Sequence, residues 1–335
     1  MSERGGSIRP AAAAGQCGLL DLIISLLPGL RITDRILQLQ AIDREEELYI
    51  QSKRDIEKII KHEIKQFWDI SEIYDRAGRI DTICRMRSIE WVSWRSENYP
   101  PLLREIYDPP SVIYYRGDLP NPEKPLLGMV GTRKPAPEAS DQAYKLSFEM
   151  GRARFSVVSG LALGIDAMSH RGNLSGGAPG YAVLGSGVDE IYPSANRPLA
   201  KRILDSGGAL ISEYPPGTRP SKWTFPARNR IISALSRSVL IVQAPEKSGA
   251  LITAAFALEH GKDLWVASSG ANPSVTAGRG TCKLAEEGAP VIFTVHDILE
   301  KWDIENIDNE DKAVTGNNCG RELAASMADF LKIEL

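Results

Sequence analysis

The sequence lacks the features that mark a disulfide-bonded, zinc-binding or membrane-spanning protein. Its 335 residues include four cysteines and four histidines, which form neither a C-x-x-C nor an H-E-x-x-H motif. A disulfide framework and a structural zinc site are therefore unsupported, and we expect neither a metal nor a cofactor. No run approaches the roughly 20 apolar residues of a membrane span, so we expect a cytoplasmic protein with no membrane partner.

An excess of one charge is also missing. The chain has 40 Lys and Arg residues against 43 Asp and Glu, a formal net charge of -3. This balance excludes a uniformly basic, histone-like protein but permits a local basic surface. Because 43% of the residues are hydrophobic and 25% are charged, the composition is ordinary for a folded globular protein. The length indicates about two domains.

Signatures of several enzyme classes are absent as well. The sequence contains no G-x-x-x-x-G-K-[ST] phosphate loop and no G-x-S-x-G nucleophile elbow. Gly185-Ser186-Gly187 lacks the third glycine of a dinucleotide-binding fingerprint and follows the third predicted strand instead of the first. We therefore expect that the protein is not an enzyme, and we assign no catalytic residue.

Hydrophobic patterning divides the chain into segments of different character. Residues 1–17 are rich in Ser, Gly and Ala and are predicted to form a flexible tail. Apolar residues at helical spacing predict a small helical domain over 18–86, and connecting strands and a loop follow over 87–125. Residues 303–335 are predicted to form an acidic C-terminal tail.

The central segment, 126–302, alternates between apolar strand-like runs and helical patterns. Unbroken Val, Ile and Leu runs are typical of strands buried on both faces, as in a parallel sheet between helices. The fold class is therefore predicted to be α/β, with a doubly wound, mostly parallel Rossmann-like sheet and a small N-terminal helical domain. Strands are predicted at 126–130, 155–158, 181–184, 209–211, 239–242 and 264–267, and helices at 138–153, 165–175, 196–206, 228–236, 249–260 and 281–287.

Glycines and hydroxyl or basic residues gather where these strands end. In a doubly wound sheet the carboxyl ends of the strands meet at one edge, where backbone N–H groups favour anions. Glycines allow close approach of the backbone, and Ser, Thr and Arg add donors for phosphate oxygens. The segments are Gly131-Thr132-Arg133, Ser159-Gly160 with Gly164, Gly185-Ser186-Gly187, and Ser248 to Thr253.

A basic stretch with aromatic residues lies between the fourth and fifth of these strands. Residues 218–238 contain five cations and no acid, interleaved with Trp223 and Phe225; the cations are Arg219, Lys222, Arg228, Arg230 and Arg237. Cations with aromatics are typical of surfaces that hold a phosphate backbone and stack unpaired bases. The alternative is a solvated basic loop. Glu213 could orient Arg228 or Arg230, and Asp166 is interpreted as a helix cap. His170 is interpreted as a packed or solvated histidine and not as a catalytic one.

Several of these segments together resemble the DprA/Smf family of DNA-processing proteins, in order over about residues 90–302. The motifs are Val130-Gly131-Thr132-Arg133, Ser159 to Asp166, Gly185 to Asp189 with Tyr192-Pro193, Phe225 to Ser233, and Ser248 to Ala254. The helical domain resembles a SAM or helix-hairpin-helix domain at Leu27 to Leu30, but Arg31-Ile32 stands where a second glycine is expected. Gly280 to Lys283 also departs from the family's glycine–x–asparagine pattern, and Ala234 replaces a usual glycine.

The resemblance implies a non-enzymatic protein that binds and protects single-stranded DNA and loads RecA recombinase in transformation and recombination, acting as a homodimer. By position, Arg133, Lys222, Arg228 and Arg230 would hold phosphates, and Phe225 would contact a base. The implied DNA-binding set is Gly131, Thr132, Arg133, Ser159, Gly160, Gly164, Gly185, Ser186, Gly187, Lys222, Phe225, Arg228, Asn229, Arg230, Ser248 and Thr253.

Two other functions stay open. One is a Rossmann-like hydrolase or sensor of nucleotide derivatives, because Ser248 to Glu259 loosely resembles the glycine–threonine–glutamate arrangement of such enzymes, without their paired glycines. The other is a structural adaptor that has lost DNA binding. The cations at Arg133, Lys222, Arg228 and Arg230 argue against the adaptor, since an idle surface has no reason to keep them together.

Overall fold

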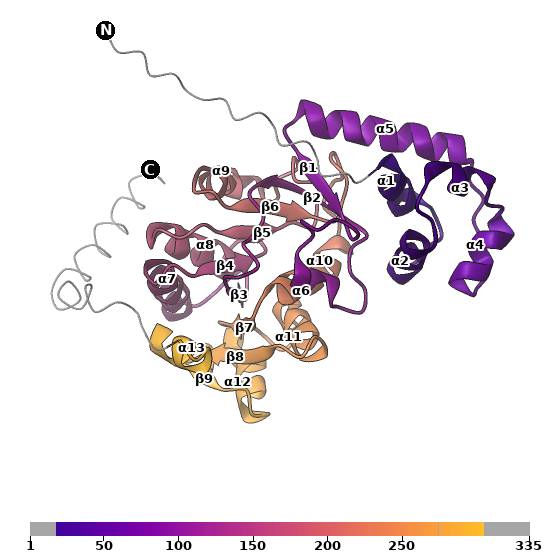
Figure 1. The fold of residues 1–335 in the computed structure, drawn as a ribbon. Helices are drawn as coiled ribbons and strands as arrows, with labels where there is room; N and C mark the ends of the chain where they lie inside the picture. The colour runs from indigo at the N-terminus through magenta and orange to yellow at the C-terminus, as the bar shows by residue number, and fades with distance from the viewer. Residues whose placement is uncertain (1–17, 274, 305–335) are drawn as a thin grey trace, which may run out of the picture.

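A nine-stranded sheet with helices on both faces forms most of the structure, a computed structural model that describes residues 18–273 and 275–304 (Figure 1). The tail predicted at 1–17, and residues 305–335 of the tail predicted at 303–335, lie outside the described residues. The strand order is β1-β2-β6-β5-β4-β3-β7-β8-β9. The strands are β1 (Glu90–Ser93), β2 (Val112–Gly117), β3 (Leu126–Val130), β4 (Ser156–Ser159), β5 (Tyr181–Val183), β6 (Ala209–Ser212), β7 (Ser238–Ile241), β8 (Asp263–Ala267) and β9 (Val291–Ile292).

The pairing confirms the predicted fold class. Every pair from β6 through β9 is parallel, whereas β1 and β2 are added antiparallel at one edge, with β2 against β6. The segment predicted as a connection between domains therefore contributes two strands to the sheet itself. Strands β3 to β7 are buried along their whole length, because helices cover both of their faces.

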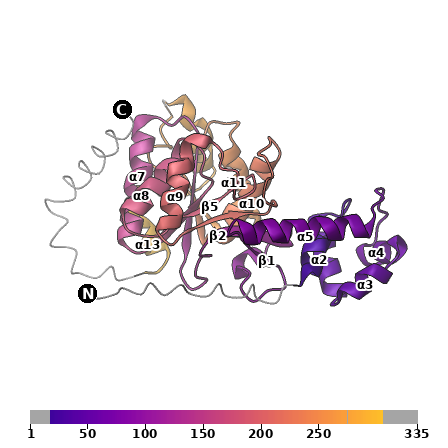
Figure 2. The same cartoon turned by 90° about the horizontal axis from the view of Figure 1, so that it is seen from above.

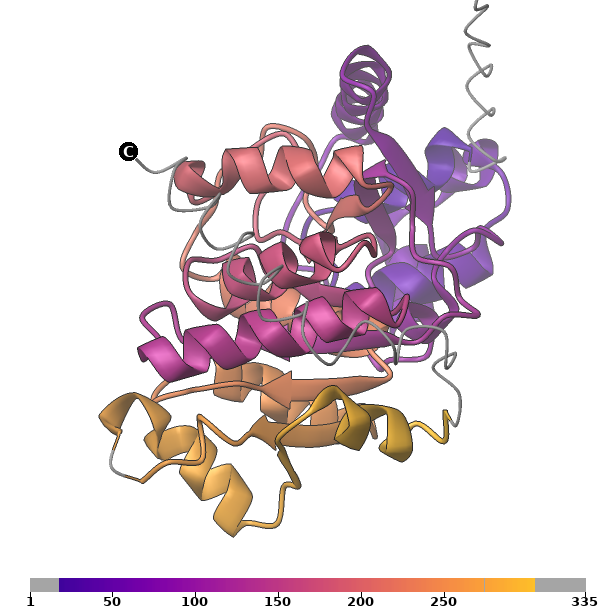
Figure 3. The same ribbon diagram turned by 90° about the vertical axis from the view of Figure 1, so that its left-hand side faces the viewer.

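The helices separate into two layers. One layer packs on Leu127, Met129 and Leu240 and, toward β6, on Ala182 and Leu210; the other packs on Val130, Val158 and Ile241. Figure 3 shows the first layer lying over one face of the sheet. Its helices are α7 (Pro137–Arg152), α8 (Ile165–Ser175), α9 (Arg197–Asp205) and α13 (Val295–Lys301). The second layer contains α6 (Pro101–Arg104), α10 (Thr224–Leu235), α11 (Gly249–Glu259) and α12 (Arg279–Glu286), and two short 3-10 turns occupy Ser194–Asn196 and Thr276–Gly278.

The N-terminal helices form a separate bundle beside the β1 edge (Figure 2). They are α1 (Leu19–Leu26), α2 (Ile32–Ala41), α3 (Glu45–Ile50), α4 (Lys53–Ile60) and α5 (Ile70–Met86). Apolar side chains of this bundle join those of β2, α8 and α9 in one buried cluster. Polar bonds reinforce the contact: the Ser93 hydroxyl donates to Asp21, and Arg95 lies 3.4 Å from Asp21 and 3.3 Å from Asp43. None of the helices in the described part of the chain is long and apolar enough to cross a bilayer.

Candidate functional site

The carboxyl ends of β3 and β7 open into a cavity of about 800 Å³, which we call the strand-end pocket. Beyond these strand ends the connecting loops run to helices on opposite faces of the sheet, which leaves a crevice at the sheet edge. Three stretches of chain supply most of its walls, namely the segments after β3, around the start of α10, and from the end of β7 into α11. The lining residues are 130–134, Ala162, Asp166, Tyr192, 220–222, Phe225, Pro226, Arg228, Asn229, Pro245, 247–250 and Thr253.

Positive charge dominates the strand-end pocket. Its lining contains five cations and one carboxylate, Asp166; the cations are Arg133, Lys134, Lys222, Arg228 and Lys247. Among the described residues, no carboxylate lies within ion-pair distance of Arg133, Lys134, Lys222 or Lys247. These four cations are therefore available to an anionic ligand, and the pocket is positive although the whole chain is not.

Arg228 is the buried cation at the base of the strand-end pocket, with 5% of its surface exposed. Its Nη1 donates to the Val183 carbonyl, and its Nε donates to Oδ1 of Asn229 at 2.9 Å. Asp166 lies 3.9 Å from Nη2. Burial lowers the pKa of Arg228 to about 10, assisted by the charge of Arg133 and opposed by that of Asp166. The guanidinium therefore stays charged at pH 7, with its orientation fixed before a ligand arrives.

Gly160 leaves the space that the Arg228 guanidinium occupies. A Cβ at this position would lie 2.0 Å from Nη2 and 2.3 Å from Nη1. We expect Gly160→Ala to displace the guanidinium and to lower the affinity for an anionic ligand about tenfold, since one charge-assisted contact would be lost. Fluorescence polarisation with a labelled single-stranded DNA measures this change.

Gly249 provides the matched control for that substitution. It lines the same strand-end pocket, but a Cβ there meets nothing within 4 Å. Gly249→Ala should therefore bind like the unaltered protein. Equal affinities for the Gly160→Ala and Gly249→Ala proteins would contradict the role given to the Arg228 guanidinium.

Aromatic rings form one wall of the strand-end pocket. The Arg133 guanidinium lies 5.3 Å from the Phe225 ring centroid, and Tyr192 lies 5.6 Å from the same ring at an interplanar angle of 42°. A small adjoining cavity of about 50 Å³ lies among these three side chains, Gly160 and Arg228. Tyr192 is 47% exposed, and Trp223 nearby is 74% exposed with the Lys222 ammonium 4.8 Å from its ring centroid. The wall thus offers exposed ring faces beside cations.

The start of α11 supplies the polar end of the strand-end pocket. Ser248 caps the helix by accepting from the Ala250 amide at 3.2 Å, and Nδ2 of Asn229 donates to the Gly249 carbonyl at 3.0 Å. Thr253 is 1% exposed, and its hydroxyl has no hydrogen-bond partner among the described residues. A buried hydroxyl without a partner is costly, so a ligand atom at this place would be stabilising.

The structure brings ten of the sixteen predicted DNA-binding residues to the strand-end pocket or its small adjoining cavity. They are Gly131, Thr132, Arg133, Gly160, Lys222, Phe225, Arg228, Asn229, Ser248 and Thr253. The interpretation of residues 218–238 as a solvated loop is wrong for most of the stretch, because α10 begins at Thr224, four residues before the predicted start of that helix. Arg219 is exposed but does not line the pocket.

The structure does not bring Arg230, to which the resemblance assigns a phosphate, to the strand-end pocket. Its Nη1 and Nη2 each donate to the Glu213 carboxylate at 2.8 Å, and its Nε donates to Asp108 at 3.0 Å. These carboxylates raise the pKa of Arg230 against the effect of burial. Arg230 is therefore neutralised within the protein, with 2% of its surface exposed, and it does not line the pocket.

Five further predicted residues shape the loops without lining the strand-end pocket. Ser159 is fully buried and donates to the Met129 carbonyl at 2.6 Å, and Ser186 donates to the Glu190 carbonyl at 2.6 Å. Gly164 has a φ of 75° and approaches the Thr132 carbonyl, which excludes a side chain. A Cβ at Gly185 would lie 3.0 Å from the Phe225 ring, and one at Gly187 would lie 2.8 Å from the Pro215 carbonyl. Tight packing explains these glycines.

Asp166 and His170 have different roles. Asp166 makes no cap: it accepts from the Ala162 amide at 3.4 Å and faces Arg228, and burial raises its pKa in spite of that cation. Of the two alternatives for His170, packed or solvated, the structure shows the packed one, and burial lowers its pKa to about 3, so its ring is neutral at pH 7. No cluster of three metal-ligating side chains occurs in the described ranges.

Lys134, Lys247 and Tyr192 line the strand-end pocket but are absent from the predicted DNA-binding set. Each adjoins a segment that the sequence did single out, because Lys134 follows Arg133 and Lys247 precedes Ser248. Tyr192 comes to the strand-end pocket from the loop after β5, where it packs on Phe225. Position after a parallel strand was the available signal for the two lysines, and for Tyr192 the signal was its place in the Tyr192-Pro193 motif after the third predicted strand.

Comparison with known proteins places this chain in a recognised family. The sequence profile of the family described as DNA recombination-mediator protein A matches residues 90–303. The chain is 39% identical over 249 residues to DNA processing protein DprA of Bacillus subtilis, covering 74% of this chain and 81% of that protein. It is 45% identical over 206 residues to protein Smf of Synechocystis, covering 60% of this chain and about half (51%) of that protein.

Two solved structures share the fold. DNA processing protein A from Streptococcus pneumoniae superposes with a TM-score of 0.67 at 30% identity, over 84% of this chain and 96% of that one. DNA processing protein A from Helicobacter pylori, described with its mode of binding single-stranded DNA, gives a TM-score of 0.56 at 29% identity, over 63% and 95%.

Proposed function

The chain belongs to the DNA recombination-mediator protein A family, and from this premise we propose that it binds single-stranded DNA in the strand-end pocket. The observation that carries the proposal is the gathering of four cations, which have no acidic partner among the described residues, beside the Phe225 and Tyr192 rings. Cations that track phosphates and rings that stack on unpaired bases together favour a single strand. A duplex hides its base faces and would leave the rings unused.

The phosphates of the strand are assigned to the cations at the mouth of the pocket. Arg133, Lys134, Lys222 and Lys247 reach it from three different loops, so that one flexible backbone can touch all of them in turn. Arg228 holds the deepest phosphate oxygen from a fixed guanidinium. Phe225 stacks on a base, and the Thr253 hydroxyl bonds a polar atom of the same nucleotide.

The proposed role is binding, protection and delivery of the strand, without catalysis. The one carboxylate of the strand-end pocket is engaged by backbone amides and faces Arg228, and the buried His170 does not line the pocket. The resemblance to DprA/Smf proteins supports loading of RecA onto the bound strand, action as a homodimer, and a place in the cytoplasm during transformation and recombination.

Fluorescence polarisation with matched single-stranded and duplex DNA tests the binding. We expect the single strand to bind at least about tenfold more tightly, because stacking of even one base on an aromatic ring contributes roughly 1–3 kcal/mol. Equal affinity for the two forms would contradict the proposal. Addition of RecA to a strand held by this protein should shorten the lag before a RecA filament grows, and an unchanged lag would overturn the loading role.

A further inference from the structure

We propose that the N-terminal bundle carries a second contact for single-stranded DNA, in a pocket that holds an unpaired base. This aromatic pocket has a volume of about 460 Å³ and is lined by Leu48, Tyr49, Gln51, Lys53, Ile56 and residues 66–70. Cavities of roughly 300–1,000 Å³ accommodate small organic ligands. The aromatic pocket lies outside residues 90–303, which the family profile matches. The inference rests on the proposed function only in taking single-stranded DNA as the ligand.

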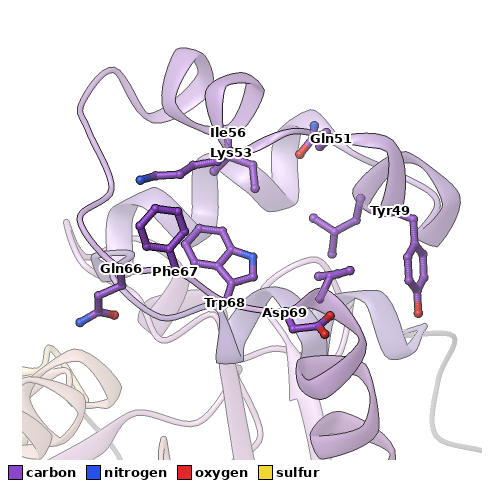
Figure 4. A pocket seen from close by; sticks show the side chains of 10 residues that line it. Tyr49, Gln51, Lys53, Ile56, Gln66, Phe67, Trp68 and Asp69 are labelled. Carbon is purple, nitrogen blue, oxygen red and sulfur yellow. The ribbon is translucent and has the colours of Figure 1, made fainter.

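Phe67 is the first observation. Phe67 is 90% exposed, more than any other exposed large hydrophobic residue in the described part of the chain. The Lys53 ammonium lies 4.7 Å from its ring centroid. Figure 4 shows Phe67 and Trp68 side by side beneath the Lys53 side chain. An exposed ring next to a cation is the pairing that binds a base through stacking and its phosphate through charge.

The remaining walls fit a planar ligand with polar edges. Tyr49 stands on the opposite side of the aromatic pocket from Phe67 and Trp68 (Figure 4), and the lining residues Leu48 and Ile56 are buried. Oε1 of Gln51 is buried, and none of the described residues donates a hydrogen bond to it. An exocyclic amine or ring N–H of a base would satisfy this acceptor, and the apolar walls would cover the faces of the base.

Charge favours a nucleic acid over an apolar peptide. A peptide covering the aromatic pocket would remove water from the Lys53 ammonium, whose ion pair with Glu57 on the same helix is long, at 3.8 Å. A phosphate would instead add a second anion beside that ammonium. Asp69, the one carboxylate in the lining, already accepts from the amide and hydroxyl of Ser71 at 2.9 and 2.7 Å, where it caps α5. It is therefore turned to its own helix.

Photo-crosslinking tests the inference with the full chain. A long single strand containing iododeoxyuridine is irradiated with the protein, and the attached peptides are identified by mass spectrometry. We expect crosslinks at residues 66–70 in addition to those at the strand-end pocket. Phe67→Ala should remove the first set and weaken binding about fivefold, the effect of one lost stacking contact. Phe293→Ala, at a ring that is 66% exposed near the far edge of the sheet, should change neither.

The outcomes separate this inference from the proposed function. Crosslinks at the strand-end pocket without any at residues 66–70 would overturn the second contact and leave the proposed function intact. Absence of crosslinks at both places would contradict both. If Phe67→Ala abolishes self-association and leaves crosslinking unchanged, the aromatic pocket binds a second copy of the chain, and the inference is wrong.

Discussion

Replacement of both Arg133 and Lys222 by alanine is expected to weaken binding of single-stranded DNA about 100-fold at moderate salt, since each charge-assisted phosphate contact contributes roughly tenfold. The two cations enter the strand-end pocket from different loops, after β3 and before α10, and neither has a carboxylate partner among the described residues. Arg133 also covers the Phe225 ring. The fold should be unaffected, because both side chains are at the mouth of the pocket.

The matched control removes two cations that lie elsewhere. Arg219 is exposed outside the strand-end pocket, and Lys201 pairs with Asp205 at 2.7 Å on the surface of α9. Arg219→Ala combined with Lys201→Ala changes the net charge by the same amount and should change the affinity less than about threefold, an effect of the long-range field alone. Polarisation titrations of the two double variants at one salt concentration make the comparison. Equal losses would mean that overall charge, and not the pocket, governs binding.

Replacement of Arg230 by alanine is expected to lower the free energy of unfolding by about 3–5 kcal/mol, the usual cost of removing one partner of a buried ion pair. The loss arises because the carboxylates of Glu213 and Asp108 would be left without their cation, and the Glu213 side chain is only 15% exposed. Urea denaturation followed by circular dichroism measures the change. Affinity for DNA, corrected for the folded fraction, should stay within about threefold, since the Arg230 guanidinium is already neutralised.

A second substitution shows whether Arg230→Ala destabilises the fold by leaving carboxylates unpaired or by removing the packing of the arginine side chain. Glu213→Gln in the Arg230→Ala background removes one of the two unpaired carboxylates and should restore about 1–2 kcal/mol of the unfolding free energy. No restoration would indicate that the packing of the Arg230 side chain, and not its charge, stabilises the fold. A large loss of affinity in the folded Arg230→Ala protein would reinstate Arg230 as a phosphate-binding residue.

The sequence was sufficient to place the strand-end pocket because of one geometric rule. Parallel strands end at a common edge, so residues that follow different strands must meet there, as Arg133, Gly160 and Ser248 do. The unbroken apolar runs also located β3 to β8 to within about two residues, since burial on both faces leaves no polar interruption. These features depend on local composition and on topology alone.

The different surroundings of the Arg228 and Arg230 side chains could not be predicted in the same way. Two residues apart on α10, they point about 200° away from each other around the helix axis. One therefore reaches the strand-end pocket, and the other reaches Glu213 and Asp108. Asp108 comes within range because β2 adds antiparallel to β6, an edge pairing that no periodicity encodes. The close approaches of Gly185 to Phe225 and of Gly187 to Pro215 likewise exist only after the loops have packed.

The salt dependence of the single-strand affinity is the most direct measurement of the central claim. With four cations at the mouth of the strand-end pocket and Arg228 at its base, the logarithm of the binding constant should fall with the logarithm of the salt concentration with a slope of about -3.5 for the unaltered protein. The slope should become shallower by about 1.4 when Arg133 and Lys222 are replaced by alanine, because two phosphate contacts are lost. An identical slope for the two proteins would show that the strand lies elsewhere.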